Sequence, residues 1–128
     1  MAKALATLFG AIYLIVGIAG FIPAFGGSMT MTSSMLFGIA EVNLLHNIVH
    51  IVIGLAGLAG GRTDAGGVSF CKVFGVILLL IGVIGYFQPN LLGILPIGGG
   101  DVWIHAVTGA ILAIVGFTAA APSRVGAP

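Results

Sequence analysis

Charged residues are scarce in this sequence, which has 4 Lys and Arg and 3 Asp and Glu among 128 residues. Soluble domains carry roughly a quarter charged residues, so a soluble globular protein is excluded. The shortage of basic residues also excludes a nucleic-acid-binding patch, and the single cysteine excludes a disulfide framework. The chain is instead 59% hydrophobic, with a mean hydropathy of +1.27. These values predict a protein whose partner is the lipid bilayer.

Four long apolar runs account for most of the chain. They cover residues 4–21, 36–59, 68–87 and 101–121. Each is close to the roughly 20 residues that a helix needs to cross a bilayer core of about 30 Å. Glycine, proline and hydroxyl residues gather between the runs, where they favour turns. We therefore predict an all-α fold, an integral membrane four-helix bundle that forms one transmembrane domain over residues 1–128.

The basic residues predict which side of the membrane each end occupies, because Lys and Arg collect in cytoplasmic segments. They are Lys3, Arg62, Lys72 and Arg124. The connections 23–35 and 88–100 contain no Lys or Arg. A four-span chain satisfies both observations when its N- and C-termini lie in the cytoplasm, so we expect a multi-pass protein with this topology.

An internal repeat emerges when the first two runs are aligned with the last two. Matching residues lie 65 positions apart in the first and third runs and 55 positions apart in the second and fourth. The matched pairs include Phe9 and Phe74, Gly10 and Gly75, Gly17 and Gly82, Gly20 and Gly85, His50 and His105, and Gly54 and Gly109. This pattern predicts two duplicated helical hairpins related by a pseudo-two-fold axis along the membrane normal. The alternative is chance similarity among glycine-rich apolar helices.

Polar residues form a stripe on the second run and recur at the start of the fourth. Asn43, His46, Asn47 and His50 fall within about a 100° arc of a helix. Asp101 and His105 are one helical turn apart, so they also share a face. Because such groups are costly against lipid, we expect both sets to point inward and toward each other.

The glycines predict close contact between helices, since small residues let membrane helices approach. The positions assigned to this role are Gly10, Gly17, Gly20, Gly54, Gly75, Gly82, Gly85 and Gly109. The same smooth faces could receive other subunits, in a homo-oligomer or a larger membrane complex. This gives one functional hypothesis, a small structural or assembly subunit.

The sequence also resembles a known family. The run Asn43-Leu-Leu-His46-Asn47-Ile-Val-His50, the later Asp101-Val-Trp-Ile-His105 and the Gly20-Phe-Ile-Pro23 end of the first run are similar to the bacterial four-span membrane family catalogued as domain of unknown function 4383. The resemblance covers nearly the whole chain. It implies a bacterial cytoplasmic (inner) membrane protein and implies no particular activity.

Four interpretations of the polar residues stay open. His46, His50, Asp101 and His105 offer nitrogen and oxygen ligands that suit Zn²⁺ or iron. His50 and His105 could instead hold a b-type haem, with Gly54 and Gly109 leaving space for the ring. Histidines can also form a proton or ion pathway. Finally, Asn and His on facing helices can simply hydrogen-bond and hold the helices together.

Of these, we favour a structural or assembly subunit with a buried His, Asn and Asp cluster, and keep a metal- or haem-binding protein as the alternative. No nucleophile and base motif or phosphate-binding loop is present, so the sequence does not predict an enzyme. Two weaker signals remain. Met29, Met31 and Met35 carry sulfur that Cu(I) accepts, although methionine more often fills gaps. Cys71 is expected to be a small packing residue without a function.

Overall fold

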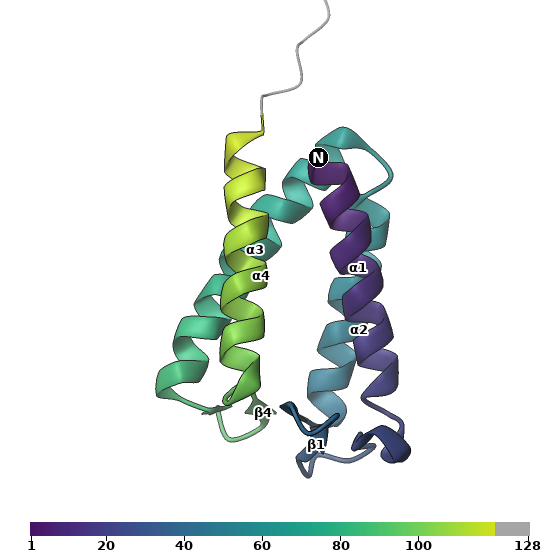
Figure 1. Cartoon of the computed structure of the whole chain (residues 1–128), viewed down its shortest axis with the longest axis vertical. Coiled ribbons are helices and arrows are strands. Elements are labelled where there is room, and N and C mark those ends of the chain that lie inside the picture. Colours follow the sequence, from purple (N-terminus) through teal and green to yellow (C-terminus); the bar gives the residue numbers. More distant parts are fainter. Residues whose placement is uncertain (120–128) are drawn as a thin grey trace, which may run out of the picture.

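The computed structural model describes residues 1–119 and consists mainly of four α-helices (Figure 1). The helices are α1 (Ala2–Ala19), α2 (Leu44–Gly60), α3 (Asp64–Phe87) and α4 (Gly100–Thr118). Arg124 and the predicted end of the fourth run at residue 121 lie outside the described residues. The predicted all-α, four-helix class is confirmed.

The helices are arranged as two closely packed pairs. α1 packs along α2 and α3 packs along α4, while contacts between the pairs are fewer. Figure 1 shows the N-terminus and the α2–α3 turn at one end and the remaining connections at the other. α1, α3 and α4 are long and apolar enough to cross a membrane, whereas α2 is apolar but has 17 residues. The molecule therefore has the helices of a membrane protein, with α2 the shortest.

The connection before α2 is a β-hairpin, where the sequence predicted helix from residue 36. Strands β1 (Ser34–Leu36) and β2 (Ala40–Val42) pair antiparallel. Phe37 and Gly38, with φ of 52° and 69°, reverse the chain as a type I′ turn requires. Hydropathy alone does not distinguish an apolar hairpin from a helix, so the predicted boundary was wrong by eight residues.

The connection between α3 and α4 contains a second hairpin with the same turn. Strands β3 (Asn90–Leu91) and β4 (Leu95–Pro96) pair antiparallel. Leu92 and Gly93 have φ of 54° and 71°, and they stand 55 positions after Phe37 and Gly38. Both hairpins lie at the same end of the helix pairs (Figure 1). A short 3₁₀ helix, η1 (Pro23–Phe25), completes the connection after α1.

Side-chain caps fix where two of the helices begin. The Asn43 side chain accepts the His46 backbone N–H at 2.9 Å, so α2 starts at Leu44, two residues before the first histidine. The Thr63 hydroxyl accepts the Gly66 N–H at 3.0 Å. As a result, α3 begins at Asp64, four residues ahead of the predicted third run.

The glycines that the sequence assigned to helix contacts lie against other parts of the same chain. A β-carbon at Gly54 would come within 2.7 Å of the Leu14 backbone, and one at Gly75 would come within 2.7 Å of Ala113. The remaining six positions are similarly close to a neighbouring element: Gly10, Gly17, Gly20, Gly82, Gly85 and Gly109. These faces are therefore filled by the chain's own helices and loops, and they offer no surface to another subunit.

Candidate functional site

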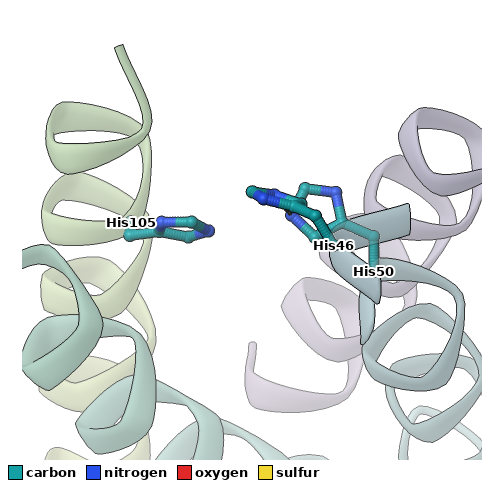
Figure 2. A group of neighbouring side chains, drawn as sticks. All are labelled: His46, His50 and His105. Carbon is teal, nitrogen blue, oxygen red and sulfur yellow. Dashed lines mark hydrogen bonds between the residues drawn. The ribbon is translucent and has the colours of Figure 1, made fainter. Parts of the chain in front are cut away.

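The three histidines of the chain converge between the two helix pairs. His46 lies in the first turn of α2, His50 one turn later, and His105 on α4. Figure 2 shows the two α2 side chains extending toward His105. Their exposed fractions are 2%, 6% and 3%. One ring nitrogen from each lies within 4.8 Å of the other two, which is a geometry that could hold a metal ion.

The hydrogen bonds of His46 determine which of its nitrogens faces the cluster. Its Nδ1 lies 2.6 Å from the Pro96 carbonyl oxygen. A carbonyl only accepts, so Nδ1 carries the proton and donates, and Nε2 carries a lone pair. That Nε2 lies 3.0 Å from Nε2 of His50. Metal-binding histidines are commonly oriented by such a bond from the second nitrogen to a backbone carbonyl.

Asp101 places a carboxylate beside the histidines. It lies in the first turn of α4 and is buried, with Oδ2 3.6 Å from Nε2 of His46. Within residues 1–119, this oxygen and Nδ1 of His50 and of His105 have no hydrogen-bond partner. Buried polar atoms are nearly always paired, so three such atoms in one cluster indicate a site with capacity for a ligand.

The two asparagines of the predicted stripe are buried, but they anchor loops and do not join the histidines. Asn43 donates from Nδ2 to Ile94 O at 2.8 Å and to Met31 O at 3.3 Å. Asn47 donates to Gly20 O at 2.6 Å and to Ser28 O at 2.9 Å. Their polar atoms hold the connections against α2. The polar stripe of α2 therefore has two parts. The asparagines are hydrogen-bonded and hold the loops, whereas the histidine part includes a ring nitrogen without a partner among residues 1–119.

The weaker candidates lie outside the cluster. Met29, Met31 and Met35 are exposed on the connection between α1 and α2. Cys71 is fully buried in α3, where its thiol donates to Ala2 O at 3.6 Å. These positions give neither the methionines nor the cysteine a part in the histidine site.

Tyr13 and Thr108 border the site, and neither was predicted from the sequence. The Tyr13 ring meets the His50 ring edge-on, with 5.0 Å between centroids. Its hydroxyl is buried and has no partner among the described residues. A signal was available, because Tyr13 lies in the middle of an apolar run, whereas Tyr86 lies at a helix end. A tyrosine hydroxyl in mid-membrane needs a polar neighbour.

Two cavities reach the histidine cluster from different sides. One, of about 230 Å³, lies between α1, α4 and the β1–β2 hairpin and includes Tyr13, His50 and Asp101 in its lining. The other, of about 20 Å³, lies between α2, α3 and the region of β4, with Leu78 in its lining. The cluster is therefore open to a small molecule on one side and nearly closed on the other.

The space that the haem hypothesis required is filled. Gly54 lies against Leu14 of α1, and Gly109 lies against Leu79 of α3, so neither glycine faces a slot for a flat ring. His46 and His50 also contact each other directly, with 4.4 Å between ring centroids. The arrangement therefore suits a small ion and does not suit a haem held by His50 and His105.

The sequence matches the model of a known protein family. The model of the family described as Domain of unknown function (DUF4383) matches residues 3–118. The chain belongs to this family. The match covers all four helices apart from Ala2, and every residue of the histidine site. The resemblance drawn from the asparagine and histidine pattern is therefore confirmed. No curated protein and no solved structure matches the chain.

Proposed function

We propose that this DUF4383 protein binds a divalent transition-metal ion within the membrane through His46, His50 and His105, with Asp101 supplying the fourth ligand. The observation that carries this proposal is the convergence of three buried ring nitrogens within 4.8 Å. Two nitrogens that each lie about 2.0 Å from a tetrahedral zinc are separated by about 3.3 Å. The 3.0 Å between His46 and His50 is close to that value.

The chemistry of the four groups supports an ion of the Zn²⁺ or Fe²⁺ type. Neutral imidazoles donate lone pairs without adding charge, and one carboxylate offsets half of the charge of a divalent ion. With no ion bound, the His50 Nε2–H donates to His46. With an ion bound, His50 would take the other neutral tautomer, with its proton on Nδ1, and the Nε2 lone pairs of both histidines would then be available to the same ion.

A bound ion would have a structural consequence that the bare histidines lack. His46 and His50 belong to the α1–α2 pair, and Asp101 and His105 belong to the α3–α4 pair. The two pairs make fewer contacts with each other than the helices make within each pair. An ion held by all four side chains would join them, so we expect metal to stabilise the fold.

We also infer the placement in the membrane from charge. Lys3, Arg62 and Lys72 lie toward the end of the molecule that carries the N-terminus and the α2–α3 turn (Figure 1). Positive residues favour the cytoplasmic side, so this end faces the cytoplasm of a bacterial inner membrane and the β-hairpins face outward. The histidine site then lies in the outer half of the membrane.

Duplication of a helical hairpin is a further part of the proposal. The two type I′ turns, Phe37–Gly38 and Leu92–Gly93, lie at the same offset of 55 as His50 and His105. Both precede the helix that carries the histidine. This agreement between loop geometry and helix sequence supports two related halves.

The test is metal analysis of protein extracted gently in detergent. We expect near-stoichiometric zinc or iron in the wild type and its loss in a His50→Ala, His105→Ala double variant. The matched control is Ile48→Ala with Val107→Ala, which changes exposed residues of the same two helices and should keep the metal. Added metal should raise the melting temperature of the stripped wild type and leave that of the double variant unchanged.

A wild type that neither retains metal nor gains stability from added metal would contradict the metal proposal. If the histidine variant also lost stability, the structural role of the cluster, as the core of an assembly subunit, would replace it. Haem would be recognised by a Soret band in the same preparation. The described residues give the subunit hypothesis no independent support, since the glycine faces are filled from within the chain.

A further inference from the structure

The turns of the two β-hairpins present large apolar side chains on the surface. Leu92 is 82% exposed and Phe37 is 55% exposed. Each is the first residue of its type I′ turn and stands immediately before a glycine. Ile39 and Ile94, which follow the two glycines, are exposed as well. Both hairpins therefore have an apolar turn, at the end of the molecule opposite the α2–α3 connection (Figure 1).

The backbone at these turns does not favour a large apolar residue. Phe37 and Leu92 have φ of 52° and 54°, in a region where bulky residues are rare. Asn, Asp and Gly are the usual residues at this position of a type I′ turn. The chain departs from that preference in the same way at both turns, 55 positions apart. Such departures are expected where a residue has another role, so these side chains are expected to contact something outside the chain.

Both hairpins lie beside the membrane helices. Phe37 lines the cavity of about 230 Å³ together with Ile12 of α1 and Ile104 of α4. Leu95 of the other hairpin lines the cavity of about 20 Å³ together with residues of α2 and α3. Ile12 and Ile104 are exposed, as the lipid-facing residues of a membrane helix are. The apolar surface of the hairpins therefore continues the lipid-facing surface of the helices.

The positions of the two hairpins favour lipid over a protein as the partner. The first hairpin borders the cavity between α1 and α4, and the second borders the cavity between α2 and α3. A bilayer surrounds a membrane protein and covers both sides, whereas one docked protein would have to reach around the helices. In addition, segments 23–40 and 88–99 contain no charged residue that would hold a turn in water.

The polar groups of the hairpins limit how deep they lie. Glu41 is exposed on β2, opposite Met35 of β1, and a carboxylate is costly in hydrocarbon. The outer edges of a two-stranded hairpin also have unpaired backbone groups, which lipid does not satisfy. Trp103, in the first turn of α4, is exposed, and tryptophan is typical of the boundary between membrane and water. The strands therefore belong at the level of the lipid headgroups.

We propose that both hairpins are embedded in the membrane interface, where Phe37 and Leu92 contact the acyl chains of the leaflet on that side. α2 has 17 residues and is about 26 Å long, which is less than the roughly 30 Å of the hydrocarbon core. The first hairpin, which precedes α2, then completes the membrane thickness at its start. The proposal requires the helices to cross a membrane, and it does not depend on a bound metal ion.

The test measures depth in a liposome bilayer with a nitroxide label on single cysteines of the full chain, in a Cys71→Ala background. Phe37→Cys and Leu92→Cys report on the turns. Leu80→Cys is the reference within a span, and Asp64→Cys, at the exposed start of α3, is the reference in water. Oxygen concentrates in the bilayer, whereas a nickel chelate stays in water. We expect the ratio of oxygen to nickel accessibility at both turns to be several-fold above that at Asp64.

A substitution at one turn tests the proposal by the sign of its effect. Leu92→Asn supplies a residue that a type I′ turn favours, so the melting temperature should rise if this turn lies in water. If Leu92 contacts acyl chains, the lost apolar contact should lower the melting temperature in liposomes. Leu92 is mostly exposed, so few contacts within the chain are lost. The proposal predicts the lower melting temperature.

Two results would overturn the proposal. They are oxygen-to-nickel ratios at Phe37 and Leu92 equal to that at Asp64, and an unchanged or higher melting temperature for Leu92→Asn. Turns in water with Leu80 in lipid would leave the membrane fold intact and assign the turns to a protein partner or a second copy. Leu80 in water would contradict the membrane-spanning helices themselves. Circular dichroism checks the folding of each variant. Repeating the measurement on metal-stripped protein separates this proposal from the metal proposal, because the depth of the turns should not change.

Discussion

The two cavities beside the histidines occupy corresponding places in the two halves of the sequence, yet they differ about tenfold in volume. Their lining positions match at the offsets of 65 and 55. Tyr13 of the larger cavity corresponds to Leu78 of the smaller one, Asp101 to His46, and Thr108 to Ile53. Residues at these offsets line both cavities, and the side chains at the matched positions differ.

The comparison separates the residues that build the bundle from those that make one side distinctive. His50 and His105 are the same residue in both halves, and so are Gly54 and Gly109. Three of the four buried polar atoms that lack a partner among residues 1–119 belong to residues of the larger cavity, whereas the smaller cavity is lined by apolar side chains and the three histidines. Ligand access is therefore expected from the α1–α4 side alone.

The largest change in stability is expected from removing a side chain that fills the smaller cavity. Leu78 is fully buried at the smaller cavity, so Leu78→Ala should lower the free energy of unfolding by about 3 kcal/mol. Reversible unfolding in mixed micelles gives this value. Leu80→Ala, at an exposed position of the same helix, is the control and should change stability little. Equal losses in the two variants would mean that the smaller cavity is not a packed region.

A smaller loss is expected where the halves differ in a buried amide. Asn47 donates to two loop carbonyls, whereas the corresponding Val102 cannot. Asn47→Val leaves both carbonyls without that partner, so the free energy of unfolding should fall by about 2 kcal/mol. Metal content should stay unchanged, because Asn47 does not point into the cluster. Loss of metal at unchanged stability would contradict the division of the polar stripe into structural and ligand parts.

The sequence predicted the helices well because their signal is local. A run of apolar residues determines that a segment enters the membrane, whatever it packs against. The hairpins were missed because Leu36 to Val42 is as apolar as the helix that follows. Only the Gly38 turn and the Asn43 cap separate the two, and both are weak signals in a chain with 22 glycines.

The candidate site was predictable to the extent that helical periodicity allows. Spacing predicted that His46 and His50 share an inward face, and the repeat aligned His50 with His105. Residue spacing predicts which face of a helix a side chain occupies, but it does not predict which atoms that side chain will contact. The contact of His46 with the Pro96 carbonyl and the loop contacts of Asn47 therefore required the three-dimensional structure.

The next largest effect is expected on metal affinity and concerns Asp101, which lines the larger cavity and lies beside the histidines. Asp101→Asn keeps the shape of the side chain but removes its charge, so metal affinity should fall about tenfold, or about 1.4 kcal/mol. Competition with a chelator of known affinity measures this. Asp64→Asn, at the exposed start of α3, is the matched control. A similar affinity for both variants would remove Asp101 from the ligand set and leave the three histidines.

The smallest effect is expected where the halves differ by a single sulfur atom. Cys71 lies 65 positions after Ala6, and both side chains are fully buried. Cys71→Ala gives the second half the residue of the first and removes one long contact to Ala2 O. The free energy of unfolding in mixed micelles should therefore change by about 1 kcal/mol or less, with metal content as in the wild type. A loss near that of Leu78→Ala would show that the thiol has a packing role that Ala6 does not share, and the two halves would then differ in their helix contacts as well as in their cavities.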